Sequence, residues 1–259
     1  MSYIYQCRMN KEAKKSFSSF LKRYGLKSRT KIDKPCVFFG IYWNDLESIL
    51  NHKSLAIAVW RGSDILKKKN LERCRKNKRI KHVAISSFIE NDLKKAGISY
   101  KFIPITGSDP DMFTSYPLGD EVYVYIPKGR YDFYGGSVVD KIRSKCKFKI
   151  NIIDGSNKMK RDELIDLYKK CFIGLRLTSH DGIANSVIEM GLMGRKCIYN
   201  DLKVPNAISW DADDIEDILN KIELESDNIG KINNEVSQMV RKYINVGRDW
   251  LDTKYWRDK

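Results

Sequence analysis

The stretch from Glu163 to Asn200, ELIDLYKKCFIGLRLTSHDGIANSVIEMGLMGRKCIYN, decides the fold that we predict. It reads as a helix, a short apolar strand, a loop, a second helix and a second strand, which is the alternation of a parallel sheet with crossover helices. The loop carries Asp181 and Gly182, and Glu189 follows eight positions after Asp181. Because the N–H groups at a helix N-terminus favour phosphate, this joint can hold a nucleotide diphosphate, with Glu189 accepting hydrogen bonds from the ribose.

The acid–glycine pair, the second acid and the tail Gly194–Ile198 resemble the donor-binding motif of GT-B glycosyltransferases of the retaining, glycogen-synthase-like group. In that family the first acid is usually Glu, where this chain has Asp181, and the tail reads G-x-P-V-I, where this chain has GRKCI. The resemblance covers residues 160–200 well and the rest of the chain weakly. It implies an α/β fold of two Rossmann-like βα lobes, a donor site in the C-terminal lobe, and a C-terminal helix that packs back across the lobes. It also suggests a compact variant, such as a bacteriophage that modifies its DNA would encode.

Strand and helix patterns alternate on both sides of a segment rich in Gly, Pro and Asp. We therefore predict a basic N-terminal acceptor lobe over residues 1–106 and a linker over residues 107–120. Residues 121–259 form a C-terminal nucleotide-sugar-binding lobe with a tail helix. The predicted strands are 35–43, 54–60, 82–86 and 98–105 in the first lobe, and 121–127, 148–154, 172–178, 196–200 and a short one near 207–210 in the second.

The positive charge of the chain is concentrated in the first lobe. The net charge is +15; residues 1–106 hold 24 Lys/Arg against 8 Asp/Glu, a balance of +16, and residues 107–259 hold 24 against 25, a balance of −1. Two runs, Lys11–Lys34 and Lys67–Lys81, supply most of the excess. A single charged run is usually a solvated face, but an asymmetry between whole halves indicates a polyanionic partner: DNA or an anionic membrane surface.

Composition excludes several classes of protein. With 42% hydrophobic residues a real core is expected, and no run of about 18 apolar residues predicts a transmembrane helix. The first residues lack the apolar region of a signal peptide. The six cysteines contain no CxxC pair and the three histidines have no metal spacing, so we expect reduced thiols and no metal site. These features predict a cytoplasmic protein, in the host cytoplasm if it is viral.

The resemblance implies a set of donor-binding residues. Backbone N–H groups around Ala184–Ser186 would bind the diphosphate, and basic side chains would neutralise it as it leaves. Arg176 ends an apolar strand, where burying it unpaired would be costly, so we expect it to bind phosphate in fork geometry. The ordinary alternatives are a helix start for Asp181–Glu189 and a surface arginine on an edge strand for Arg176. The predicted set is Lys128, Arg130, Arg176, Thr178, Gly182, Asn185, Ser186 and Glu189.

The stretch Trp60–Asp64, WRGSD, resembles the H-G-(S/T)-D loop at the catalytic face of the family, with Arg61 in place of the His. The predicted catalytic residues are Asp64, as a base or acceptor-orienting group, Arg61, and Asp181, which would face the hydroxyls of the transferred sugar. Asp64 could equally cap the helix that follows. The predicted acceptor-binding residues are Tyr42, Trp43, Lys67, Lys68, Arg75 and Lys78.

The sequence thus predicts a retaining transfer of a hexose from a nucleoside-diphosphate sugar, UDP-glucose by default, to a hydroxyl on a polyanionic acceptor. The favoured acceptor is 5-hydroxymethyl-pyrimidine in DNA; no permanently bound cofactor and no metal is required. One alternative is a peripheral-membrane transferase for a surface glycan or glycolipid, to which Phe17, Phe20, Leu21 and Tyr24 would offer an apolar helix face. The other is a non-catalytic nucleic-acid-binding module whose donor site has decayed.

Overall fold

The computed structural model describes residues 3–9, 14, 17–155, 159–244 and 247–256, without the side chains of Trp43 and Asn44. Its contacts divide the chain into two compact units. Unit 1 comprises Met1–Asp109, His180–Ile183 and Ile244–Lys259, and unit 2 comprises Pro110–Ser179 and Ala184–Tyr243.

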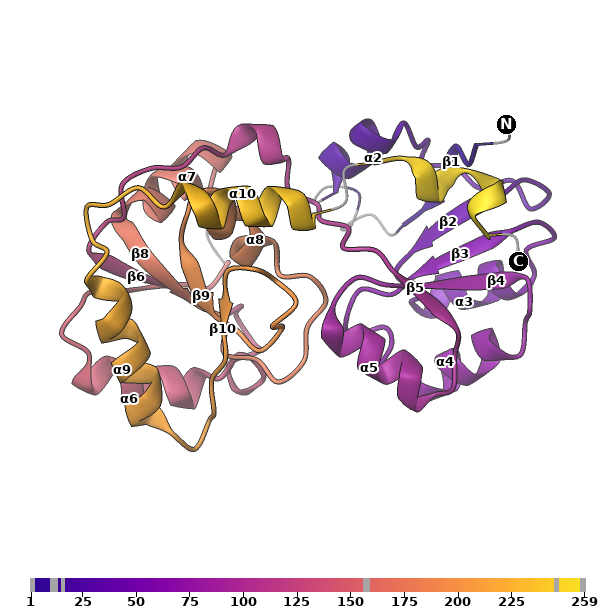
Figure 1. Ribbon diagram of the computed structural model, residues 1–259. Coiled ribbons are helices and arrows are strands. Elements are labelled where there is room, and N and C mark those ends of the chain that lie inside the picture. The colour runs from indigo at the N-terminus through magenta and orange to yellow at the C-terminus, as the bar shows by residue number, and fades with distance from the viewer. Residues whose placement is uncertain (1–2, 10–13, 15–16, 156–158, 245–246, 257–259) are drawn as a thin grey trace. The chain divides into compact units, whose positions relative to one another are not determined.

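Unit 1 is built on a parallel five-stranded sheet in which the strands follow their order in the sequence, β1-β2-β3-β4-β5 (Figure 1). The first strand, which the sequence patterns did not reveal, pairs with β2. The elements are β1 (Gln6–Arg8), α2 (Ser18–Tyr24), β2 (Cys36–Phe39), α3 (Trp43–Leu50), β3 (Ala56–Val59), α4 (Lys68–Arg75), β4 (Ile80–Ala84), α5 (Ser87–Lys95), β5 (Tyr100–Phe102) and two C-terminal 3₁₀-helices (Asp249–Leu251, Thr253–Trp256).

Both faces of the unit 1 sheet are buried. Successive side chains of a strand point to opposite faces, and β2 shows this plainly. Phe38 packs edge-on against His52 with ring centroids 5.3 Å apart, while Phe39 packs against Phe17 and Phe20 at 4.8 and 4.6 Å. The central strands β2 and β3 therefore read as continuous apolar runs, CVFF and AIAV, rather than as alternating ones.

The aromatic side chains of the N-terminal helix belong to this core. Phe17, Phe20 and Tyr24 are 5%, 0% and 0% exposed, so they offer no apolar face to a membrane, contrary to the expectation attached to the membrane alternative. The chain after α10 returns to unit 1, where the ring of Trp250 packs against Tyr24 at 5.5 Å and the N–H of Ile4 donates to the carbonyl of Leu251. Figure 1 shows this yellow segment beside α2 and β1.

Unit 2 also has a parallel five-stranded sheet, but its order is β10-β9-β8-β6-β7. Its elements are a 3₁₀-helix (Pro110–Met112), β6 (Glu121–Tyr125), a 3₁₀-helix (Asp132–Tyr134), α6 (Gly136–Lys145), β7 (Ile150–Ile153), α7 (Arg161–Lys170), β8 (Cys171–Leu175), α8 (Asn185–Leu192), β9 (Lys196–Ile198), β10 (Ala207–Ile208), α9 (Ile215–Ser226) and α10 (Asn234–Tyr243).

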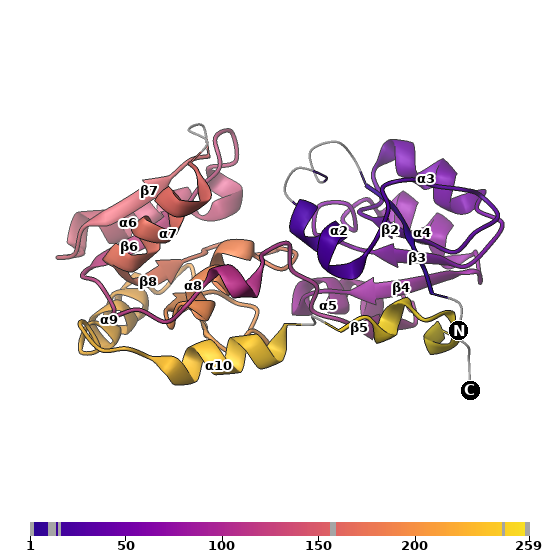
Figure 2. The same ribbon diagram turned by 90° about the horizontal axis from the view of Figure 1, so that it is seen from above.

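The strand order of unit 2 reverses between β6 and β8. The chain moves from β6 to β7 in one direction and then crosses back to β8, so right-handed crossovers place α6 on one face and α7 and α8 on the other. A core of apolar side chains from β6 and β8 packs against Val139 and Ile142 of α6 and Ile218 and Ile222 of α9. Figure 2 shows α10 alongside α8, with which it is in contact.

The two units differ from the predicted division in two places. Unit 2 begins at Pro110, inside the predicted linker, and residues His180–Ile183 and Ile244–Lys259 group with unit 1 although they follow the linker in sequence. Within the described part of the chain, no helix is long and apolar enough to cross a membrane.

Candidate functional site

The loops that leave β6 and β8 meet at the reversal point of the unit 2 sheet. In an open α/β sheet, ligands bind outside the carboxyl ends of the strands where the strand order reverses. Gly135, in the β6–α6 loop, has φ +67°, and a Cβ there would lie 2.4 Å from the carbonyl oxygen of Leu177, which follows β8. The absent side chain thus lets the N-terminus of α6 pack directly on the loop that carries Arg176 and Thr178.

Arg176 lies at this reversal point, on a central strand rather than an edge strand. Its side chain is only 7% exposed, and its guanidinium carbon lies 4.3 Å from the ring centroid of Tyr134 and 5.3 Å from that of Tyr125. Both rings therefore lie within cation–π distance of the guanidinium. Thr178 is fully buried in the same loop. The aromatic partners of Arg176 were not apparent in the sequence.

The predicted basic pair of the donor lobe lies in the β6–α6 loop. Lys128 and Arg130 are exposed, and Gly129 between them has φ +77° with nothing within 4 Å of a Cβ added there. The N–H of Lys128 donates to Asp154, and that of Arg130 donates to Pro127. The backbone of this loop is therefore fixed while both charged side chains reach into solvent beside the carboxyl end of β6.

Glu189 is buried in α8 and already has partners within unit 2. One carboxylate oxygen accepts a hydrogen bond from the Arg161 guanidinium, and the other accepts one from the Tyr168 hydroxyl at 3.0 Å. A carboxylate has about four acceptor positions. A ribose hydroxyl must therefore share this carboxylate with Arg161 and Tyr168 or displace one of them, a competition that the sequence did not reveal.

The helix that carries Glu189 begins at the predicted diphosphate-binding residues. Ala184 is the N-cap of α8 and provides no side-chain cap, and the half-buried Asn185 and Ser186 follow it in the first turn. The first N–H groups of a helix have no partner within the helix. This end of α8 therefore presents donors that an anion could accept.

Unit 1 brings the two predicted catalytic loops together. A Cβ added to Gly182 would lie 2.1 Å from the carbonyl oxygen of Arg61, and one added to Gly62 would lie 3.1 Å from the N of Gly182. The hydroxyl of Ser86, at the carboxyl end of β4, donates to the carbonyl of Asp181 at 3.1 Å. Only glycine permits this approach of the two backbones. The W-R-G-S-D and H-D-G segments therefore pack directly against each other through their glycines.

Asp64 holds the shape of this loop. Its carboxylate is fully buried and accepts hydrogen bonds from the N–H groups of Ile41 and Arg61, each at 2.9 Å. Burial raises the pKa of this carboxyl, and the two backbone hydrogen bonds act in the opposite direction. It does not cap the next helix, because α4 begins at Lys68 after Lys67. With no exposed oxygen, Asp64 positions Arg61 and Gly62 rather than meeting a solvent-borne substrate.

Arg61 is held on aromatic rings. Its guanidinium carbon lies 4.2 Å from the ring centroid of Phe17 and 5.0 Å from that of Phe39, and burial lowers its pKa. The neighbouring loop is tied down as well: the His180 ring nitrogen Nε2 lies 2.7 Å from the Asp92 carboxylate, and its ring packs 5.8 Å from Phe88. Asp181 therefore follows a residue with a fixed side chain.

The six predicted acceptor-binding residues do not form one surface. Tyr42 and Lys67 lie together near the carboxyl ends of β2 and β3, with the Lys67 ammonium 5.9 Å from the Tyr42 ring centroid. Helix α4 then runs away from that edge, so Arg75 and Lys78 line a pocket at the amino ends of β4 and β5. Lys68 opens α4, and the side chain of Trp43 lies outside what the structure describes.

Arg195, in the motif tail, has a structural role that the sequence did not reveal. It is fully buried and donates to the carbonyls of Tyr168, Cys171 and Pro117 at 3.1, 3.2 and 2.6 Å, among others. Burial lowers its pKa to about 10, so it remains charged at neutral pH. The positive charge lies at the C-terminal end of α7, where the helix dipole is negative.

In the described residues, no group of three or more His, Cys, Asp and Glu side chains is arranged to hold a metal ion. In unit 2, Arg176, Lys128 and Arg130 lie at or beside the reversal point and are the candidate diphosphate-binding groups.

Solved structures share this fold. Sucrose-phosphate synthase from Thermosynechococcus elongatus is 10% identical over 88% of this chain and 72% of its own, with a TM-score of 0.59. TarM is 14% identical over 92% of this chain and 54% of its own, with a TM-score of 0.54. An S. aureus TarM variant in complex with fondaparinux, alpha-GlcNAc-glycerol and UDP is 13% identical over 88% and 55%, with a TM-score of 0.57.

The comparison confirms the predicted GT-B fold of two Rossmann-like lobes, and at these identities it establishes the fold alone. The chain spans just over half the length of the two TarM structures. No family model matches the chain, and no curated protein matches it in sequence.

Proposed function

We propose that the chain is a nucleotide-sugar-dependent glycosyltransferase that moves a hexose to the hydroxyl of 5-hydroxymethyl-pyrimidine in DNA. One observation carries the donor half of this proposal. The reversal point of the unit 2 sheet has a guanidinium, Arg176, that lies against two tyrosine rings, beside a glycine that draws the start of α6 against the β8 loop. A planar, permanently charged fork at such a point suits a diphosphate.

The donor that we propose is a nucleoside-diphosphate sugar, with UDP-glucose as the first to try. A structure of the same fold contains UDP, which supports this choice of nucleotide. Glu189 would hold the ribose, in exchange with its present partners Arg161 and Tyr168. The N–H groups of Asn185 and Ser186 and the side chains of Lys128 and Arg130 would bind the diphosphate.

The proposed reaction retains the anomeric configuration. The acceptor oxygen forms its bond to the anomeric carbon on the face from which the diphosphate departs, the bond from that carbon to the phosphate oxygen breaks, and the hydroxyl proton passes to the departing oxygen. No side-chain nucleophile is needed. Cationic groups that stabilise the developing charge contribute most to such a step, and losing one costs about 10²–10³ in rate.

The roles of the unit 1 loop follow from its geometry. Asp64 acts as a positioning residue that fixes Arg61 and Gly62, and Asp181 remains the group that we expect at the sugar hydroxyls. Since no oxygen of Asp64 is exposed, we do not propose it as a base.

Charge supports DNA as the acceptor. Unit 1 has 28 Lys/Arg against 13 Asp/Glu and so carries the whole net charge of +15, while unit 2 has 20 of each. DNA is a polyanion whose binding is dominated by such contacts. Of the four residues on which docking to a lipid surface depended, Phe17, Phe20 and Tyr24 are buried and only Leu21 is partly exposed, which favours DNA over a membrane.

The test is transfer of labelled glucose from UDP-glucose to DNA that contains 5-hydroxymethyl-pyrimidine, with unmodified DNA as a control. We expect label on the modified DNA alone and at least about a 100-fold loss in Arg176→Gln, which removes the charge at the diphosphate. The matched control is Arg143→Gln, which removes an exposed arginine of α6 and should leave the rate unchanged.

Other outcomes would replace the proposal. Hydrolysis of UDP-glucose that needs Arg176, without transfer to DNA, would move the acceptor to a glycan or glycolipid. No use of any nucleotide sugar would leave a nucleic-acid-binding module, an outcome consistent with a Glu189 carboxylate already engaged by two partners.

A further inference from the structure

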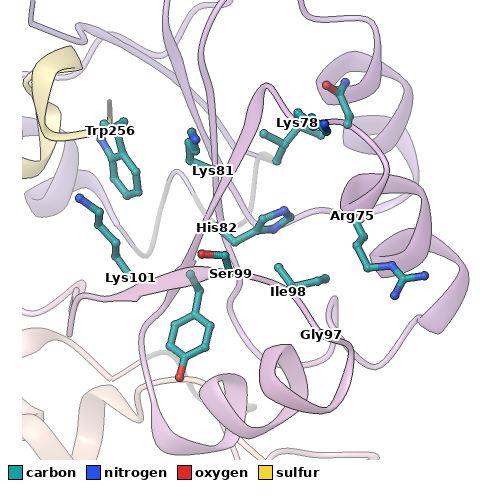
Figure 3. Close-up of a pocket in the computed structure, with 12 residues that line it drawn as sticks. Arg75, Lys78, Lys81, His82, Gly97, Ile98, Ser99, Lys101 and Trp256 are labelled. Carbon is teal, nitrogen blue, oxygen red and sulfur yellow. The ribbon is translucent and has the colours of Figure 1, made fainter. Parts of the chain in front are cut away.

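A basic pocket of about 400 Å³ opens at the amino ends of β4 and β5, entirely within unit 1 (Figure 3). We propose that this pocket is a second docking site for the phosphate backbone of the acceptor DNA, remote from the loop of Arg61 and Asp64. The inference rests on the proposed function only in taking the bound DNA to be the acceptor.

The pocket is formed by residues that precede or begin the two strands. At β4, Lys78 lies in the turn before the strand, and Lys81 and His82 lie within it. At β5, the loop of Gly97–Ser99 precedes the strand, and Lys101 lies within it. In Figure 3, Trp256 and Lys101 lie on one side and Arg75 and Lys78 on the other. Its volume falls in the usual range for ligand sites, about 300–1,000 Å³.

Charge is the main property of this pocket. Arg75, Lys78, Lys81 and Lys101 contribute four cations, and none of the twelve described residues that line it is an Asp or a Glu. Like charges that line one recess repel one another. A bound polyanion would relieve the repulsion in the pocket.

His82 adds a hydrogen-bond donor to the pocket without adding charge. Its Nδ1 lies 3.1 Å from the indole N–H of Trp60, which can only donate, so the imidazole proton resides on Nε2. Burial lowers the pKa of His82 to about 4. The charge of the pocket therefore stays constant across the physiological range and comes from lysine and arginine alone.

The C-terminal segment completes the wall opposite Arg75. The Lys101 ammonium lies 3.7 Å from the Tyr255 ring centroid and 5.1 Å from that of Trp256, and the Trp256 indole N–H donates to the carbonyl of Trp250. The Lys101 ammonium near its ring and the hydrogen bond from its indole N–H both fix the Trp256 side chain, which therefore gives the pocket a rigid wall. A phosphate–sugar backbone has both charged and apolar surfaces, and it suits a cavity with this mixture.

The shape of the pocket favours DNA over a lipid surface. A membrane-docking face needs projecting apolar side chains, but the apolar residues here, Ile80, Ile98 and Trp256, are 4%, 6% and 5% exposed. They line the floor and wall of a recess and cannot reach into a bilayer. The lysines at the rim can reach the phosphates of a strand that passes across it.

The position of the pocket predicts a dependence on DNA length. The pocket lies at the amino ends of the strands of unit 1, whereas the loop of Arg61 and Asp64 lies at their carboxyl ends. The five residues of β4 span about 16 Å at 3.3 Å per residue. DNA has one phosphate per 3.4 Å of each strand, so at least about five base pairs separate the two edges. Only longer acceptors can use the pocket while their target base is elsewhere.

The experiment measures binding of unmodified, fluorescent duplex DNA to the full chain by anisotropy, over a range of salt and without any nucleotide sugar. Arg75→Gln and Lys78→Gln change exposed side chains on elements that keep their backbone contacts. For each variant we expect a salt slope less steep by about 0.9 and affinity lower by about eight-fold at 0.1 M salt. The control Lys141→Gln, exposed on α6 of unit 2, should change affinity less than two-fold.

Two results would overturn the inference: DNA affinity and salt slope unchanged in the double variant Arg75→Gln/Lys78→Gln, or binding to phosphatidylserine vesicles that needs both residues while DNA does not bind. If the variants lose DNA binding but the wild-type protein transfers no glucose, this site is kept and the proposed function is rejected. If the wild-type protein transfers glucose to modified DNA but the variants bind DNA as the wild type does, the proposed function is kept and this site is rejected. The fold of each variant is checked by its thermal transition.

Discussion

The two units have sheets of the same size but place their charges differently. Unit 1 carries the entire net charge of +15, largely on its surface; of its buried polar groups, the Trp60–His82 pair is neutral and the Asp64 carboxyl is held by backbone N–H groups. Unit 2 has no net charge, yet it buries a charged arginine, Arg195, and a carboxylate, Glu189. Its strand order also reverses, whereas that of unit 1 follows the sequence.

This difference shows how one architecture can provide two kinds of binding. A surface excess of one sign attracts a polyanion over a wide area and needs no exact geometry. Buried charges at a reversal point require paired partners, and they give a small ligand a defined orientation. We therefore assign recognition of DNA phosphates to unit 1 and recognition of the nucleotide to unit 2.

The largest expected effect breaks the buried charge of unit 2. Arg195→Met leaves the carbonyls of Tyr168, Cys171 and Pro117 without their donor, and we expect a loss of about 4 kcal/mol in the free energy of unfolding. Urea denaturation measures it, with the exposed Arg143→Met as the control. A loss below about 1 kcal/mol would show that water or a shifted backbone replaces the arginine.

A smaller effect belongs to unit 1, which contains all three histidines of the chain. The folded pKa of His82 is about 4, below its ordinary value of 6.5, so between these values the unfolded chain binds the additional proton. Stability is therefore full above pH 6.5 and falls as pH drops towards 4, by about 3 kcal/mol from this group. His82→Gln keeps an acceptor for Trp60 and should flatten the stability–pH curve measured by thermal unfolding.

His82 is not the only histidine that contributes to the stability–pH curve. Burial also lowers the pKa of His52, so the His82→Gln protein should retain part of the slope. A curve identical to that of the wild type would mean that folding does not lower the pKa of His82.

The smallest effect concerns the β6–α6 loop, which offers a matched pair of glycines. Gly135→Ala places a Cβ 2.4 Å from the Leu177 carbonyl, whereas Gly129→Ala at φ +77° meets nothing within 4 Å. Both substitutions place an alanine at a positive φ, which costs about 1 kcal/mol. Only Gly135→Ala also requires the backbone around Leu177 or α6 to shift. We expect Gly135→Ala to be less stable than Gly129→Ala by about 2 kcal/mol.

UDP binding measured by calorimetry adds a functional readout to this pair. Weaker binding is expected in Gly135→Ala alone, because only that change pushes α6 away from the loop of Arg176. Equal binding by both variants would separate the nucleotide site from this packing contact.

The sequence predicted the elements with strong apolar runs and the loops between them. The alternation of strand and helix was visible from residue 35 onward, and the motif between Glu163 and Asn200 located α7, β8, α8 and β9. It missed β1, because a three-residue strand with one outward arginine, Arg8, has no period of its own. It also could not show that His180–Ile183 group with unit 1, since contacts distant in sequence decide that.

For the candidate site, residue types were easier to predict than their partners. The proximity of the Arg61 and Asp181 loops followed from two glycines that the motifs already contained. The ring partners of Arg176, the Arg161 and Tyr168 contacts of Glu189 and the burial of Asp64 depend on side-chain directions that spacing does not encode. The acceptor set divided in two because α4 spans from one edge of the sheet to the other.

The connectivity of the chain has a consequence for its synthesis. Most of unit 1 precedes unit 2 in the sequence, but its core includes Trp250, Leu251 and Trp256, which come after the whole of unit 2. At the usual 5–20 residues per second, about 7–27 s separate Asp109 from Ile244. During that interval Tyr24 lacks its aromatic neighbour Trp250, so all residues of unit 2 are synthesised before the core of unit 1 can be completed.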